Sequence, residues 1–140
     1  MADALNYLAL ARKAGLCELG EEPVGAITRA GKGYLVIVAS DASDHTWRRA
    51  KSFVAGTHQQ AVRIPATKDE MGFIVGRTSL AIAAITDPSM ALAMVKALGN
   101  PEKYADALAA LEEKSAKQKL HAKEAKAHQR NVRFGKKNRV

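Results

Sequence analysis

The sequence predicts an α/β domain in which helices cover both faces of a small, mixed sheet. Two continuous apolar runs, residues 34–39 (YLVIVA) and residues 79–85 (SLAIAAI), are typical of strands that are buried on both faces. Segments with helical spacing of their apolar residues alternate with these runs. The chain has 140 residues and 47% hydrophobic content, so we expect one domain with its own core over residues 1–100.

The chain is predicted to begin with a helix and a short strand. In residues 4–15, Leu5 and Leu8 lie at helical spacing, and Gly15 follows two cations that favour the end of a helix. Residues 16–19 (LCEL) have room for only a short strand.

A second helix is predicted to start at Glu21 and to stop at Gly31. The acids Glu21 and Glu22 suit a first turn because the helix dipole favours negative charge there. Pro23 also suits it because the first turn needs no intrahelical N–H donor. Gly20 then serves as the turn between the short strand and this helix.

Caps and glycines predict the next elements. Residues 34–39 should form a central strand, and a third helix should follow it and end at Gly56. Residues 61–64 (AVRI) should then form a short strand. Thr67 and Glu70 have the spacing of a capping box, which predicts a short fourth helix before the strand within residues 79–85.

The C-terminal part is predicted to be helical and then irregular. Asp87 as N-cap and Pro88 at the first position predict a fifth helix that ends at Gly99. Residues 101–130 should form an increasingly basic helix, and residues 131–140 have no helical pattern and should be a disordered basic tail. The apolar residues expected to dock this last helix on the body are Tyr104, Leu108 and Leu111.

The charge is concentrated at the C-terminal end. Residues 1–113 carry 12 Lys or Arg and 13 Asp or Glu, a net charge of −1, whereas residues 114–140 carry ten and one, a net charge of +9. A polycationic segment favours a polyanionic partner, either nucleic acid or an anionic membrane surface. The alternative is a disordered end that only improves solubility.

No catalytic site, metal site or cofactor is expected. The four histidines and the single Cys17 do not occur at metal-ligand spacing. Residues 72–79 (GFIVGRTS) resemble a phosphate-binding loop only superficially, since three residues separate the glycines where four are required and Arg77 stands in place of lysine. Aromatic residues make up only 5% of the chain, which argues against base stacking as the main binding mode.

We expect a cytoplasmic protein without a membrane partner. No apolar run approaches the roughly 18 residues that span a bilayer, and the N-terminal segment lacks the layout of a signal peptide. A single cysteine fits a reducing compartment. A lone domain of this size with no apolar seam also predicts a monomer.

Four separated segments resemble segments of one known superfamily, and they occur in the order in which that superfamily has them. They are residues 10–15 (LARKAG), Gly20 at the start of the second helix, residues 30–43 (AGKGYLVIVASDAS) and residues 70–87 (EMGFIVGRTSLAIAAITD). Together they are similar to the small ribosomal proteins that bind kink-turn RNA, and most to their stand-alone bacterial YlxQ-like branch. The resemblance covers residues 3–98 and implies a three-layer α/β/α sandwich.

The resemblance also implies an RNA-binding surface. Gly20 corresponds to the family's glycine that lets the RNA backbone approach, and a second loop of the family beside the RNA corresponds to Gly76, Arg77 and Thr78. The basic surroundings of that surface correspond to Arg12, Lys13 and Lys32.

The sequence departs from the family at the position of its specific RNA contacts. Glu22, Pro23 and Ala26 stand where kink-turn binders typically carry asparagine, glutamate and lysine. An ionised glutamate cannot donate, proline has no N–H, and alanine carries no charge. These differences argue against recognition of the sheared G·A pairs of a standard kink-turn.

Three interpretations of Glu21 and Glu22 remain open. The acids can stabilise the helix start through the dipole by ~0.3 to 1 kcal/mol each. They can accept hydrogen bonds from guanine edges or amino groups of an RNA, or they can meet a basic surface of a ribosomal protein or translation factor.

The sequence therefore predicts a non-enzymatic RNA-binding protein related to ribosomal proteins, with structured RNA such as rRNA as its partner. The alternative is a protein-interaction module of the ribosome or of a translation factor, anchored to rRNA by its tail. The tail residues expected to contact RNA phosphates are Lys117, Lys119, Lys123, Lys126, Arg130, Arg133, Lys136 and Lys137.

Overall fold

The computed structural model describes residues 2–138 of the chain, and the side chains of residues 3–127. Helices and strands alternate through the body, as the sequence predicts. In chain order the elements are α1 (Ala2–Ala14), β1 (Cys17–Leu19), α2 (Glu21–Arg29), β2 (Leu35–Val38), α3 (Asp44–Val54), β3 (Gln60–Arg63), α4 (Lys68–Ile74), β4 (Ile82–Ile85), α5 (Pro88–Leu98) and α6 (Ala105–Asn138).

The four strands form one mixed sheet in the order β1-β4-β2-β3. β4 pairs antiparallel with both β1 and β2, whereas β2 and β3 are parallel. All residues of β2 and β4 are buried, which confirms the prediction that the two apolar runs form the inner strands. The register places Leu35 opposite Ile85 at one end of the sheet and Val38 opposite Ile82 at the other.

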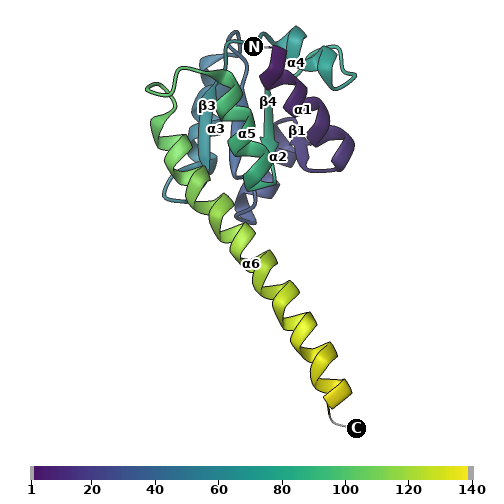
Figure 1. Ribbon diagram of the computed structural model, residues 1–140. Coiled ribbons are helices and arrows are strands. Elements are labelled where there is room, and N and C mark those ends of the chain that lie inside the picture. Colours follow the sequence, from purple (N-terminus) through teal and green to yellow (C-terminus); the bar gives the residue numbers. More distant parts are fainter. Residues whose placement is uncertain (1, 139–140) are drawn as a thin grey trace.

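Helices cover both faces of this sheet (Figure 1). α2 and α3 pack against each other on one face, and α1, α5 and α6 pack in succession on the other. The fold is therefore the predicted α/β/α sandwich. α4 lies beside α1 at the end of the sheet opposite to the one from which α6 leaves the body (Figure 1).

Local signals in the sequence set most helix ends. Thr67 and Glu70 form both hydrogen bonds of a capping box, and Asp87 Oδ2 accepts from the Met90 N–H at 2.9 Å. Gly31 and Gly99 follow helices with φ of 73° and 71°, a left-handed conformation that glycine adopts without strain.

The C-terminal helix differs from its prediction at both ends. It begins at Ala105 instead of residue 101, because residues 101–104 form turns, in which the Lys103 and Tyr104 N–H groups both donate to the Asn100 carbonyl. Tyr104 and Leu111 are buried against the body as predicted, while Leu108 is half-buried.

α6 also continues to Asn138, so the expectation of a disordered tail from residue 131 is corrected for residues 131–138. Extending a helix that is already nucleated fixes one residue for each new hydrogen bond, which is less costly than starting a helix in the same sequence. Residues 139–140 lie outside the described part of the chain.

Candidate nucleic-acid interface

The two glycine loops predicted from the sequence meet at one end of the sheet. The Gly20 N–H donates to the Ile82 carbonyl at 3.0 Å, so the turn after β1 lies beside the start of β4. Arg77 Nη1 lies 3.9 Å from the position that a Cβ on Gly20 would occupy. The guanidinium group of the second loop therefore covers the glycine of the first.

Gly20 has a backbone conformation that a side chain would disfavour. Its φ of 96° and ψ of 163° lie in a region that is essentially restricted to glycine. It is the N-cap of α2, and within the described part of the chain no side-chain cap accepts a hydrogen bond from the first N–H groups of that helix. Free N–H groups at a helix start are suited to an anion such as a phosphate.

The second loop is held by Gly72, a residue that sequence analysis did not single out. A Cβ on Gly72 would lie 2.8 Å from the Ser79 backbone and 2.9 Å from the Arg77 carbonyl oxygen. The Arg77 N–H also donates to the Gly72 carbonyl at 2.8 Å. Gly76 has open space around it and a φ of 78°, so it turns the loop, whereas Gly72 lets the loop pack on α4.

Arg12 and Arg77 both act on the half-buried Cys17 at the start of β1. Burial raises the pKa of the Cys17 thiol, and the charges of Arg12 and Arg77 lower it. The two arginines therefore bring positive charge to the same strand from α1 and from the second loop. Lys13 and Thr78 are exposed next to them in the chain.

Glu21 is engaged within the protein. Its Oε1 lies 2.6 Å from Arg49 Nε, which joins the first turn of α2 to α3. Arg49 also lies over the Phe53 ring, 5.2 Å from its centroid. The exposed Glu22 has no ion pair among the described residues, so the two acids do not form an equivalent pair.

Lys32 does not join this surface. It follows the C-terminal end of α2, a helix of nine residues, and therefore lies roughly 13 Å or more along the helix from Gly20. His58 Nε2 lies 3.0 Å from the Gly31 carbonyl oxygen at the same end. The structure therefore places Lys32 and Gly20 at opposite ends of α2, an arrangement that sequence proximity to a strand does not reveal.

The predicted basic residues of the C-terminal segment lie on α6, which extends away from the end opposite to α4 (Figure 1). Lys117 Nζ lies 3.1 Å from Glu113 Oε1, and Lys119, Lys123 and Lys126 are exposed. The side chains of four further predicted residues lie outside the described range: Arg130, Arg133, Lys136 and Lys137. The cations of α6 therefore do not surround Gly20 and Arg77.

Phe73 is a second feature that sequence analysis missed. It is 83% exposed on α4, immediately before the Gly76 loop. Met71 is buried, and a residue two positions later lies on the opposite side of a helix. The helical spacing from Met71 could therefore have predicted that Phe73 faces solvent.

Among the described residues, no group of three or more histidine, cysteine or carboxylate side chains could hold a metal ion. Within the same part of the chain, no helix is long and apolar enough to cross a membrane.

No protein-family model matches the chain, and no curated protein matches its sequence. Solved structures do share its fold. A protein with unknown function from Bacillus halodurans superposes with a TM-score of 0.65 at 22% identity, over 70% of this chain and 98% of that one. The Giardia lamblia 15.5kD RNA binding protein superposes with a TM-score of 0.61 at 18% identity, over 75% and 88% of the two chains.

Proposed function

We propose that this protein is a non-enzymatic, cytoplasmic RNA-binding protein that holds structured RNA, such as rRNA, against the Gly20 turn and the Gly76 loop. The observation that carries this proposal is the meeting of the two loops, with Arg77 Nη1 at 3.9 Å from the Cβ position of Gly20. A structural neighbour named as an RNA binding protein supports it at the level of the fold.

The surface suits recognition of RNA by backbone and shape. Gly20 lets a phosphate approach the free N–H groups of α2, and the planar guanidinium of Arg77 can donate two parallel hydrogen bonds to phosphate oxygens. Phe73 adds an exposed ring on which an unpaired base can stack. These contacts do not depend on the asparagine, glutamate and lysine of standard kink-turn binders.

Replacing Arg77 tests the surface directly. For a structured RNA recovered by crosslinking from cells, Arg77→Gln should make the slope of log affinity against log salt shallower by about 0.7 to 1, the value for one lost phosphate contact. Lys32→Gln is the matched control, because it removes the same charge at the other end of α2. Equal effects of the two substitutions would contradict the proposal.

α6 should add salt-dependent affinity for a separate RNA segment. The last described hydrogen bonds between α6 and the start of α5 are made by Gln118, so truncation after Ala122 preserves these bonds. This truncation removes seven Lys or Arg and one Glu. If five of these cations each neutralise a phosphate, the salt slope should become shallower by about 4. An unchanged slope would refute this role of α6.

The same truncated chain separates RNA binding from a protein-interaction role. If it still recovers discrete RNA sites, the Gly20 and Gly76 surface reads RNA. If the truncated chain recovers ribosomal proteins or translation factors but no RNA, the surface binds protein and α6 alone anchors the molecule.

A further inference from the structure

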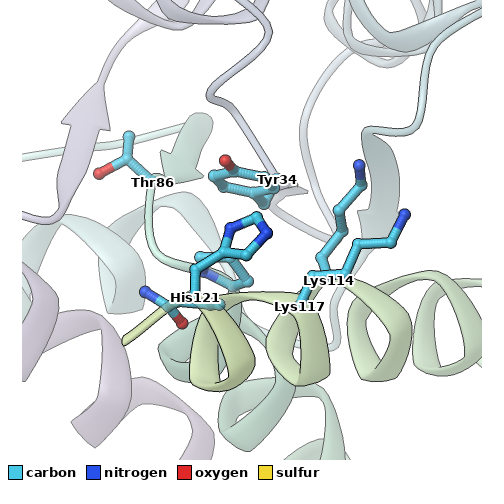
Figure 2. A pocket seen from close by; sticks show the side chains of 7 residues that line it. Tyr34, Thr86, Lys114, Lys117 and His121 are labelled. Atoms are coloured by element: carbon cyan, nitrogen blue, oxygen red, sulfur yellow. The ribbon is translucent and has the colours of Figure 1, made fainter. Parts of the chain in front are cut away.

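A cavity lies at the end of the sheet opposite to the Gly20 turn. It has a volume of about 370 Å³ and is formed between α6 and the residues next to the start of β2 and the end of β4 (Figure 2). β4 separates it from the Gly20 end by about 13 Å, the length of four strand residues. Its lining includes Tyr34, Thr86, Lys114, Lys117, Gln118 and His121.

Hydrogen bonds hold α6 in place beside this cavity. Gln118 Nε2 donates to Asp87 Oδ1 at 2.6 Å, and Ser89 Oγ donates to Gln118 Oε1 at 2.7 Å. The hydroxyl groups of Ser89 and the buried Ser115 lie 3.0 Å apart. The cavity is therefore preformed, and a ligand need not order the helix on binding.

The charge of the cavity is positive. Lys114 and Lys117 line it, and none of its lining residues is an acid. The nearby Asp87 already accepts from the Met90 N–H and from Gln118. Lys117 pairs with the exposed Glu113, and such a solvated pair is weak enough for an incoming anion to replace the carboxylate.

Two rings supply a surface for a flat ligand. Tyr34 and His121 lie opposite each other across the cavity, and Lys114 and Lys117 extend beside them from α6 (Figure 2). The Tyr34 ring also contacts His58, with the two centroids 5.6 Å apart and the planes at 45°. This contact restricts the Tyr34 ring, which therefore needs little reorganisation to stack on a base.

We propose that this cavity is a nucleotide site, in which Lys114 and Lys117 bind a phosphate while Tyr34 and His121 contact the base. The ligand chemistry is a phosphorylated nucleoside, supplied either by a single-stranded segment of RNA or by a free nucleotide. If the ligand is a segment of RNA, the inference rests on the proposed function. A strand held here lies at the other end of the molecule from RNA at Gly20, so the protein would contact two separate RNA segments.

The test is titration of the full-length protein with adenosine 5′-monophosphate, adenosine and a hexa-adenylate RNA. We expect the ring resonances of Tyr34 and His121 to shift in nuclear magnetic resonance spectra with a phosphorylated probe and much less with adenosine. A response to the monophosphate assigns the site to a free nucleotide, and a response to the hexanucleotide alone assigns it to an RNA strand. Absence of a shift with both would overturn the proposal.

Charge-matched variants make the test specific to the cavity. The double variant Lys114→Gln with Lys117→Gln should weaken binding of the responding probe about tenfold or more, the effect of one lost charged hydrogen bond. The control double variant, Lys119→Gln with Lys123→Gln, removes the same charge from exposed positions of α6 outside the cavity lining. It should change the affinity for the probe by less than about twofold. Equal losses would overturn the proposal.

A third variant, Tyr34→Leu, keeps an apolar side chain at this position and should weaken binding about fivefold or more through the lost stack. Structured RNA is titrated in parallel with Arg77→Gln. If Arg77→Gln weakens that RNA while neither small probe shifts Tyr34 or His121, the nucleotide site is refuted and the proposed function stands.

Discussion

Glu21 Oε1 lies 2.6 Å from Arg49 Nε, so the acid at the start of α2 is tied to α3. This ion pair gives the first acid of α2 a structural role in addition to its favourable position near the helix dipole. Of the two acids at the start of α2, Glu22 is therefore the exposed one.

The Glu21–Arg49 pair should contribute modestly to stability. Its side chains are 36% and 48% exposed, so a double-mutant cycle of Glu21→Gln and Arg49→Gln should give a coupling energy of about 0.2 to 1 kcal/mol in urea unfolding. The cycle of Glu22→Gln with Arg49→Gln is the control and should give no coupling. Equal coupling in the two cycles would mean that the pair does not form specifically.

Gly72 should be more sensitive to substitution than Gly76. Gly72→Ala places its Cβ 2.8 Å from the Ser79 backbone, and we expect a loss of about 1 to 3 kcal/mol in the free energy of unfolding with weaker RNA binding. Gly76→Ala meets no atom within 4 Å and should cost only the strain of its left-handed backbone, about 1 kcal/mol. Urea unfolding of both variants compares the two losses in the free energy of unfolding. A larger loss in Gly76→Ala than in Gly72→Ala would contradict the prediction.

Gly20 substitutions should affect stability as well as binding. The φ of 96° at Gly20 makes any side chain at this position costly by about 1 to 3 kcal/mol. We therefore expect Gly20→Ala and Gly20→Val both to lower the free energy of unfolding. RNA affinities should be compared at a temperature where circular dichroism shows each variant folded. Wild-type stability in Gly20→Ala would contradict the strained geometry.

Phe73 should contribute to RNA affinity without contributing to stability. Phe73→Ala should weaken RNA binding by about fivefold or more if the ring stacks on a base, and its 83% exposure predicts an unchanged unfolding midpoint. Leu120→Ala removes another exposed apolar side chain, 54% exposed on α6, and should leave affinity unchanged. An unaltered affinity in Phe73→Ala would exclude the stacking contact.

Cys17 should report on the charge at the interface. Burial raises its thiol pKa, so at pH 7.5 the folded protein holds less reactive thiolate than the denatured chain and should react more slowly with iodoacetamide. The rate should rise as the pH approaches the folded pKa. Because Arg12 and Arg77 lower that pKa, Arg77→Gln should raise it and slow alkylation further. An unchanged rate in Arg77→Gln would place Arg77 away from Cys17.

Local chemistry in the sequence determined the elements and their order. The apolar runs specified β2 and β4 because strands covered on both faces need unbroken apolar residues. Helix ends were specified by caps and left-handed turns, which are local interactions, at Thr67, Asp87, Gly31 and Gly99. Gly20 and Arg77 were also recognisable, through the resemblance of their segments to a known family.

The arrangement of those elements depended on strand pairing and packing, which no local pattern contains. The sheet order places Gly20 beside Arg77 but sends Lys32 and the basic helix α6 to the other end. The Glu21–Arg49 pair and the cavity beneath α6 likewise join residues from separate segments. Side chains far apart in the chain become neighbours only when the core packs, so the surface chemistry of this protein follows from its tertiary structure.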